Sequence, residues 1–153
     1  MPQPGAEHRR LERLAGTWTG EETLYPSPWA PEGATAVGRI EARIGLGGFF
    51  LVSDYTEERD ERVWYRGHGV YGWDPKRERY TMSWFDSLGS VPRAPSLGVW
   101  EGQTLAFQDP DPRCHSRDTY EWAGPDRHRF RIETSRDGAE WSPMMEATFR
   151  KSG

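Results

Sequence analysis

The chain has 153 residues, which is enough for one domain with a sizeable buried core. Aromatic residues make up 13% of it, and glycine and proline contribute 17 and 12 residues, so the chain is too aromatic to be disordered and too rich in turn formers for a helical bundle. The formal charge of −4, with both signs mixed along the chain, argues against nucleic acid as a partner.

The chain begins with a loose leader, residues 1–6, followed by a short amphipathic segment. Residues 7–15 carry Leu11 and Leu14 three positions apart among charged residues, which predicts a short helix ending at Gly16. No apolar run approaches the ~20 residues of a membrane span, and no signal sequence follows the N-terminus. We therefore expect a cytoplasmic protein without a membrane partner.

From residue 17 onward apolar and polar residues alternate, which is the period of a β-strand. Glycine, proline and aspartate residues that favour turns separate the alternating segments at regular intervals. The pattern predicts about ten strands, at residues 17–25, 35–46, 49–57, 63–73, 79–86, 96–100, 104–108, 114–122, 127–135 and 142–151. Strands joined by such short turns pair antiparallel in a meander.

Glycines inside the predicted strands favour a barrel over a sandwich. They stand at Gly20, Gly38, Gly67, Gly69 and Gly72. Glycine weakens a strand unless a sharp bend or a close approach needs it, and the coiled strands of a barrel provide that need. Closure also removes exposed edge strands. The prediction is an all-β fold, one antiparallel barrel domain over residues 1–153 with the N-terminal helix at its floor.

Four short segments resemble known families. Residues 14–20, Leu-Ala-Gly-Thr-Trp-Thr-Gly, resemble the opening of calycin-type barrels: lipocalins, fatty-acid-binding proteins and nitrobindins. Three further segments are similar to motifs of a bacterial family catalogued only as a domain of unknown function: 46–51 (Leu-Gly-Gly-Phe-Phe-Leu), 69–74 (Gly-Val-Tyr-Gly-Trp-Asp) and 84–87 (Trp-Phe-Asp-Ser). The resemblance spans residues 7–151 and implies a calycin-like barrel of about ten strands, but no reaction.

The same resemblance has consequences for single residues. It implies that Trp18 plugs the barrel floor and that Arg117 faces inward. The sequence departs from the family at Phe49, where arginine is usual, and at Ser116, where tryptophan is usual. Nitrobindin-like barrels bind haem through a histidine on a late strand. Residues 143–150 contain two methionines and no histidine, which counts against haem, and we expect no cofactor.

The predicted strand at residues 79–86 carries the first candidate site. Alternation places Met82, Trp84 and Asp86 on one face, which the bulky apolar residues mark as inward. Asp86 then lies near the barrel mouth, where it binds a polar group of a ligand or acts as a base with a raised pKa. In the alternative interpretation, Asp86 caps the following loop by accepting backbone hydrogen bonds.

For the strand at residues 114–122, two interpretations of which face points inward remain. Hydrophobicity places Tyr120 and Trp122 inside, whereas the resemblance places Arg117 inside, and both hold only if a bulge intervenes. Inside, Arg117 is the natural partner of Asp86 or the anchor of a ligand carboxylate. Outside, Arg117 forms a surface ion pair of little energetic value.

His68 is a further catalytic candidate. Facing inward between two glycines, it would be a proton shuttle or a metal ligand, but Arg66 on the same face indicates the outside. The other histidines fit helix, loop-edge and surface positions: His8, His115 and His128.

Glu22 and Asp54 form a possible acid pair. Each falls on a face with apolar residues, and two carboxylates inside one barrel would raise each other's pKa and could perform acid/base chemistry. Neutralisation by Arg39, Arg43 or Arg117 is the alternative.

Motifs of nucleotide binding and of serine hydrolases are absent from the sequence, and no His, Asp or Glu pair has convincing metal-ligand spacing, so we expect no metal. The single cysteine, Cys114, excludes an intramolecular disulfide and fits packing better than nucleophilic catalysis.

The function that fits these features best is binding of a small apolar or aromatic molecule inside the barrel. The predicted ligand contacts are Asp86, Arg117, Trp84, Tyr71, Tyr120 and Met82. An alternative is a cofactor-independent isomerase, cyclase or hydrolytic enzyme that uses the same cavity, with Asp86 or His68 as the catalytic residue. A third is a homodimer or protein-interaction module whose interface contains Trp29 and Trp100.

Overall fold

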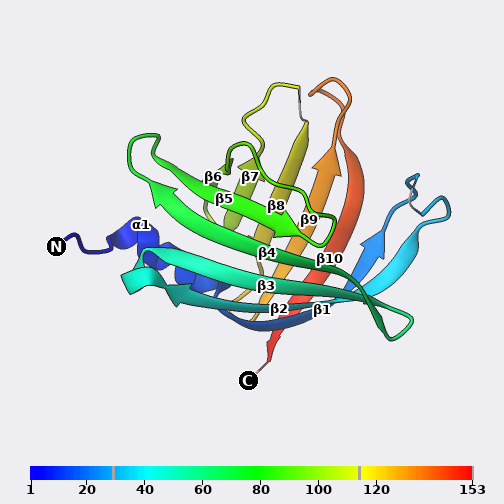
Figure 1. Cartoon of the computed structure of the whole chain (residues 1–153), viewed down its shortest axis with the longest axis horizontal. Helices are drawn as coiled ribbons and strands as arrows, with labels where there is room; N and C mark the ends of the chain where they lie inside the picture. Colours follow the sequence, from blue (N-terminus) through cyan, green and yellow to red (C-terminus); the bar gives the residue numbers. More distant parts are fainter. Residues whose placement is uncertain (29, 114, 153) are drawn as a thin grey trace.

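The computed structural model describes residues 1–28, 30–113 and 115–152. A short N-terminal helix is followed by ten strands that close into a barrel (Figure 1). The helix consists of α1 (Ala6–Arg9) and a 3₁₀ segment, η1 (Arg10–Leu14), and a second 3₁₀ turn, η2 (Leu46–Gly48), lies between two strands. The strands are β1 (Gly16–Leu24), β2 (Ala34–Gly45), β3 (Phe50–Arg59), β4 (Arg62–Asp74), β5 (Arg79–Asp86), β6 (Ser96–Glu101), β7 (Thr104–Gln108), β8 (Ser116–Trp122), β9 (Arg127–Thr134) and β10 (Ser142–Ser152).

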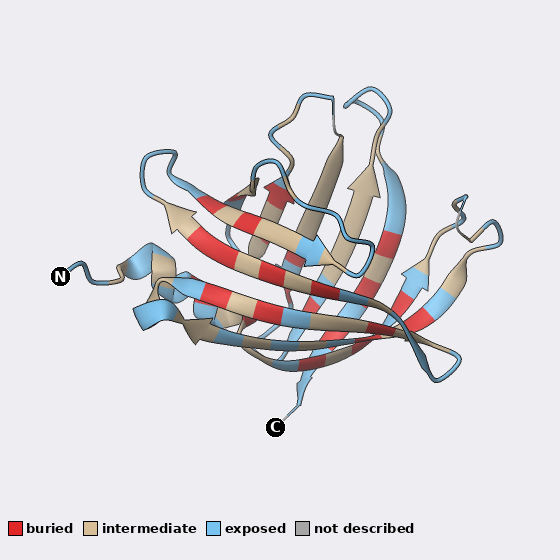
Figure 2. Ribbon diagram, in the orientation of Figure 1, coloured by how far each residue is buried: buried red, intermediate tan, exposed pale blue. Residues whose placement is uncertain are grey.

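Each strand pairs antiparallel with its neighbours in sequence, and β1 pairs with β10 to complete the ring. The predicted all-β barrel of about ten strands with an N-terminal helix is therefore confirmed. Along β3 and β4, buried residues alternate with more exposed ones, which is the pattern of strands with one face toward a core (Figure 2).

The helix closes one end of the barrel. Leu11 and Leu14 are buried in the same hydrophobic cluster as Tyr71 and Tyr80, and the hydroxyl of Tyr80 donates a hydrogen bond to the backbone oxygen of Glu7 at 2.8 Å. Burying a leucine side chain this completely stabilises the fold by roughly 1.5–3 kcal/mol. The helix therefore forms the floor of the barrel. The strand ends of β1, β3 and β5 that lie farthest from the helix surround the other opening.

Trp18 is fully buried at this floor. Its indole Nε1–H donates to the backbone oxygen of Leu14 at 3.0 Å, which joins the first strand to the last turn of the helix. This is the floor position that the resemblance to calycin-type barrels implied.

Two of the strand glycines provide clearance for side chains that lie flat along the inner wall. A Cβ atom on Gly67 would lie 1.9 Å from the ring of Trp84, and one on Gly38 would lie 2.6 Å from Oε2 of Glu22. Both glycines thus allow a neighbouring side chain to cross their strand, which is the close approach that explains glycine within a strand. None of the helices in the described part of the chain is long and apolar enough to cross a membrane.

A candidate ligand site at the mouth of the barrel

A cavity of about 580 Å³ lies on the inner side of β5. Met82 and Trp84 on β5 and Ser96 on β6 form its barrel wall, and the segments 91–94 and 109–111 line the rest. Trp84 lies four residues beyond Tyr80, which contacts the floor, so the cavity belongs to the opposite end of the barrel. Two of the predicted ligand contacts, Met82 and Trp84, therefore line one cavity.

A hydrogen-bonded chain connects Trp84 to Asp86. The indole Nε1–H of Trp84 donates to the hydroxyl oxygen of Tyr65 at 2.7 Å, and that hydroxyl donates to Oδ2 of Asp86 at 3.0 Å. The other carboxylate oxygen of Asp86 accepts from the backbone N–H of Leu88 at 3.0 Å. Asp86 therefore caps the following loop, as the alternative interpretation predicted, and also accepts a hydrogen bond from an aromatic residue of the inner wall. Its role as a ligand contact or a base stays a prediction.

Burial raises the pKa of the Tyr65 hydroxyl above its usual value, and Asp86 adds to that rise. The hydroxyl of Tyr65 thus stays protonated at neutral pH and remains a hydrogen-bond donor to Asp86. This arrangement holds the indole of Trp84 in one orientation beside the cavity.

Tyr71 and Tyr120 lie deeper in the barrel. Their hydroxyl oxygens are 2.7 Å apart, both side chains are buried, and the ring of Phe107 packs edge-on against each of them. They belong to the cluster that includes Leu11 and do not line the cavity at β5. Their role as ligand contacts stays a prediction.

Asp118 is an inward-facing carboxyl group on β8 that the sequence did not single out. Burial raises its pKa to about 7. The residue as a whole keeps partial access to solvent. Near neutral pH, Asp118 is therefore present in both protonation states.

A second acidic group, Glu22 on β1, is 1% exposed. The hydroxyl of Tyr55 on β3 donates a short hydrogen bond to its Oε2, across Gly38 on the intervening strand. Within the described part of the chain, Oε1 of Glu22 has no hydrogen-bond partner. Desolvation is the largest cause that raises the pKa of Glu22 to about 7, the Tyr55 hydrogen bond lowers it, and the Glu57 carboxylate raises it further.

Glu22 and its neighbours Tyr55 and Glu57 connect to the wall of the mouth through side-chain contacts. Arg59 donates to Glu57 at 3.3 Å, and the ring of Tyr55 lies 5.9 Å from the ring of Tyr65 and 6.1 Å from that of Trp84, centroid to centroid. The acids and aromatic rings thus form one strip along the inner wall from β1 to β5. We call Glu22, Tyr55, Glu57, Tyr65, Trp84 and Asp86 the acidic strip.

The placement of Arg117 inside the barrel, which the resemblance implied, is wrong. Arg117 lies on the outer face, where its Nε donates to Oε1 of Glu133 at 3.1 Å and its guanidinium packs 4.0 Å from the ring centroid of Trp141. The pairing of β8 with β9 runs without a register shift, so no bulge reverses the alternation that turns Tyr120 and Trp122 inward. The hydrophobic pattern was the better guide on this strand.

His68 and Asp54 also face outward. Nδ1 of His68 lies 2.8 Å from Oδ1 of Asp54, directly across the β3–β4 pair, and the imidazole side chain is 43% exposed. Arg43 approaches the same carboxylate at 3.8 Å. The interior acid pair of Glu22 and Asp54 is therefore not formed, and Glu57 is the carboxylate beside Glu22. Alternation with Tyr55 along β3 was the available signal for Glu57.

His128 is not at the surface, where the sequence suggested it would lie. It is 1% exposed on β9, and its ring packs 4.5 Å from that of Trp18 and 5.2 Å from that of Trp122. Burial lowers its pKa to about 4, so the imidazole is neutral at physiological pH. Its position two residues before the inward Phe130 was the signal in the sequence.

Two residues that the sequence singled out, Trp29 and Cys114, lie outside the described residues. In the ranges that the structure does describe, no cluster of three or more His, Cys, Asp or Glu residues has the geometry to hold a metal ion.

A closed ten-strand antiparallel barrel with a helix at its floor and a buried aromatic cluster defines the class of this protein. Residues 3–151 match the family described as a protein of unknown function (DUF1579), and the chain belongs to that family. A search of curated proteins finds no match.

Several solved structures share the fold. The chain is similar to Rv2717c from M. tuberculosis, with 12% identity, a TM-score of 0.72 and coverage of 97% of this chain and 99% of that one. It is also similar to the S-type phycobiliprotein lyase CPES from Guillardia theta, with 10% identity, a TM-score of 0.69 and coverage of 97% and 94%. A protein of unknown function from the DUF3598 family of Nostoc punctiforme gives 11% identity, a TM-score of 0.60 and coverage of 99% and 51%.

Proposed function

We propose that this protein binds a small, largely aromatic molecule at the mouth of the barrel and that the polar end of this ligand is basic or rich in N–H donors. The observation that carries the proposal is the acidic strip beside a cavity walled by Met82 and Trp84. A cavity of about 580 Å³ falls within the range of roughly 300–1,000 Å³ that small-molecule sites occupy.

The charge of the interior supports a basic ligand. Glu22, Glu57, Asp86 and Asp118 all face inward from the barrel strands. Arg59 is the one guanidinium on the inner face of the described strands, and Glu57 already neutralises it. Among the residues that line the cavity, Arg93 is the one cation, beside Asp109 and Asp111. A cationic or N–H-donating ligand that reaches the inner wall would supply the partner that Oε1 of Glu22 lacks among the described residues.

The fold is in keeping with such a use. One structure of similar fold is named a phycobiliprotein lyase. That name supports the proposal that a barrel of this kind binds a ligand.

The experiment compares two aromatic dyes of opposite charge, cationic 9-aminoacridine and anionic 1-anilinonaphthalene-8-sulfonate, by fluorescence titration. We expect 9-aminoacridine to bind more tightly. The variant Met82→Trp fills the cavity and should weaken binding at least about tenfold, because a large side chain occupies the ligand's volume. The matched control is Phe85→Ala, because Phe85 lies on the same strand but points outward and is 41% exposed.

Tighter binding of the anionic dye would overturn the basic character of the ligand. Equal binding of 9-aminoacridine by wild type and Met82→Trp would overturn the mouth as the site. A molecule that copurifies with the wild type in native mass spectrometry, and is absent from Met82→Trp, would support the site and identify the ligand.

A second candidate function, acid/base catalysis in the same interior, rests on two carboxyl groups with a pKa of about 7, Glu22 and Asp118. Such groups both donate and accept protons at neutral pH. Titration of the carboxyl carbons by ¹³C NMR tests this: both should change protonation near pH 7. If both titrate below about pH 5, the value typical of exposed carboxyls, acid/base chemistry by these residues is excluded.

A further inference from the structure

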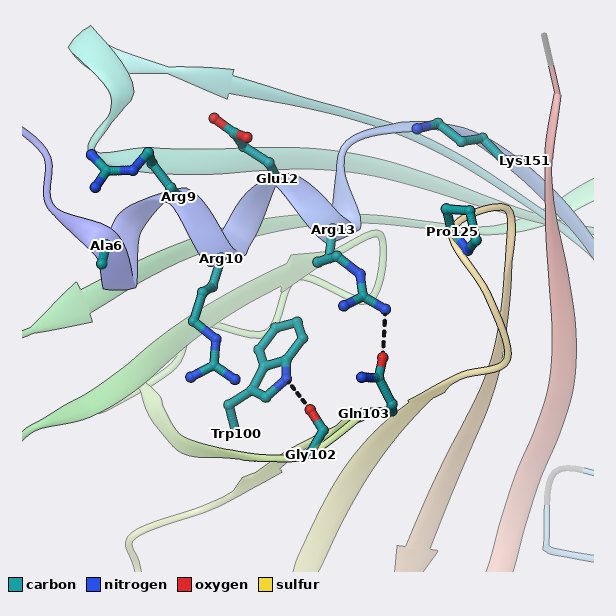
Figure 3. A pocket seen from close by; sticks show the side chains of 10 residues that line it. All are labelled: Ala6, Arg9, Arg10, Glu12, Arg13, Trp100, Gly102, Gln103, Pro125 and Lys151. Carbon is teal, nitrogen blue, oxygen red and sulfur yellow. Dashed lines mark hydrogen bonds between the residues drawn. The ribbon is translucent and has the colours of Figure 1, made fainter.

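A second cavity, of about 500 Å³, lies outside the floor of the barrel, between the helix and the β6–β7 turn (Figure 3). Four cationic side chains line it, and Glu12 is the one acid among its lining residues. The cations are Arg9, Arg10, Arg13 and Lys151. Because the chain carries a net charge of −4, this concentration of positive charge is not a consequence of overall composition. We call these four residues the floor cations.

The floor cations are not neutralised by the protein. Within residues 1–28, 30–113 and 115–152, none of the four takes part in an ion pair, whereas Arg39, Arg59 and Arg117 on the barrel wall each pair with a glutamate. Their positive charge is thus available to a ligand. A ligand of opposite charge would be attracted to this part of the surface.

Aromatic residues hold two of the guanidinium groups in place. The guanidinium of Arg10 lies 4.8 Å from the ring centroid of Trp100, and that of Arg13 lies 5.3 Å from the ring of Trp122. Arg13 also donates to Oε1 of Gln103 at 2.9 Å (Figure 3). These contacts orient the arginines without consuming their charge, which lowers the entropy that a ligand must remove on binding.

The indole of Trp100 is itself fixed. Its Nε1–H donates to the backbone oxygen of Gly102 at 2.8 Å, and its ring stacks on that of Trp122 with centroids 5.1 Å apart and planes 18° from parallel. Trp100 therefore forms a wall of the floor cavity, with Arg10 over its ring. Its role in an interface stays a prediction.

Lys151, from β10, is the fourth cation of the set. Its side chain crosses Gly16, where a Cβ atom would lie 2.5 Å from Cε of the lysine, and its Nζ lies 5.8 Å from the ring of Trp18. Gly16 has a φ of +127°, which side chains rarely adopt. Because Gly16, the first residue of β1, has no side chain, Lys151 has room to reach the floor cavity.

We propose that the floor cavity binds a small molecule through a phosphate group or a comparable multivalent oxyanion. Guanidinium groups match the geometry of phosphate oxygens, and a cavity of this volume takes a small molecule rather than a protein segment. This site is separate from the ligand site at the mouth and has the opposite charge. The two ends of one barrel therefore select for different ligands.

The test is a titration with pyrophosphate followed by ¹H–¹⁵N NMR of the Trp100 indole and the Arg13 Nε–H, at low and high NaCl. We expect saturable shifts of both signals, with affinity that falls as salt rises. The double variant Arg10→Gln/Arg13→Gln should lower the affinity by roughly tenfold or more, since each lost charged hydrogen bond is of that order.

The matched control is Arg62→Gln/Arg136→Gln, which removes the same charge from two exposed arginines away from the cavity. Lys151→Gln is a milder variant that leaves the contacts of Arg10 with Trp100 and of Arg13 with Trp122 intact. A loss of affinity in this variant therefore does not depend on how well the double variant folds. A loss in the floor variants with wild-type affinity in the control supports the site. No saturable shift in the wild type, or an equal loss in the control, overturns it.

Vesicles identify the source of the oxyanion. If pyrophosphate binds and vesicles of phosphatidylserine and phosphatidylcholine do not compete, the ligand is a free small molecule. If the vesicles bind and pyrophosphate does not, the proposed small-molecule site is wrong.

Discussion

Glu22 is a carboxyl group enclosed by protein, and its environment favours the neutral form. Desolvation raises its pKa from 4.5 to about 7, and the hydroxyl of Tyr55 offsets only part of that effect. Between these two pH values the folded protein binds a proton that the unfolded chain releases. Stability from this group is therefore greatest below about pH 4.5, falls as pH rises, and reaches its lowest level above about pH 7.

The variant Glu22→Gln tests this sign. Glutamine keeps an oxygen for the Tyr55 hydroxyl but has no charge to bury, so the variant should be more stable than wild type at pH 8, by about 3 kcal/mol for a shift of this size, and close to wild type at pH 4.5. Urea unfolding at both pH values measures the difference. Glu21→Gln is the control, because Glu21 is the exposed neighbour on the same strand. A variant that is equally destabilised at both pH values would show that Glu22 is ionised in the folded state.

At the scale of elements, β8 shows how strand pairing settles the direction of side chains. Its unbroken register with β9 turns Tyr120 and Trp122 inward and leaves Arg117 on the outer face with Glu133. The same alternation turns Asp118 into the barrel, so the interior gains a carboxyl group at the position next to the expected arginine. One residue of offset thus changes the charge that a ligand meets.

Arg117→Gln should therefore leave the mouth unaffected. The Arg117 side chain is 36% exposed, and an exposed ion pair of this kind contributes about 0–1 kcal/mol, so the loss in unfolding free energy should stay within that range. Affinity for 9-aminoacridine should remain within twofold of wild type. A loss of affinity of roughly tenfold or more, the size of a lost charged hydrogen bond to the ligand, would place the guanidinium in the binding site after all.

The whole molecule is a barrel with two dissimilar ends. The acidic strip faces the interior toward the mouth, the floor cations line the outside of the floor, and the helix with Trp18 separates them. Because the floor is packed and a cavity lies at the mouth, we expect global stability to depend mainly on the floor and ligand binding to depend on the mouth.

Leu11→Ala tests this division. Leu11 is completely buried against the barrel, so its truncation should lower the unfolding free energy by about 2–5 kcal/mol. Under conditions where the variant is folded, its affinity for 9-aminoacridine should match that of wild type. Leu88→Ala is the control; Leu88 is 75% exposed, and this change should cost less than about 0.5 kcal/mol. A parallel loss of dye affinity in Leu11→Ala would show that the floor and the mouth are coupled.

Local patterns were sufficient to predict the barrel. Alternation located the ten strands, because a strand with one buried face repeats every two residues whatever its partner is, and the leucine spacing located the helix. The same reasoning placed Met82, Trp84 and Asp86 on the inner face near the mouth, where the structure has them.

Contacts between distant strands were beyond such reasoning. Glu22 reaches Tyr55 across a glycine on the strand between them, and Arg13 meets Gln103 although 90 positions separate them in the chain. Periodicity gives the face of a residue but neither the neighbouring strand's register nor the gap that a glycine leaves. The acidic strip and the floor cations form only because closure of the barrel brings these strands and the helix together. The sequence therefore determines which residues are present, and the tertiary structure determines which of them become neighbours.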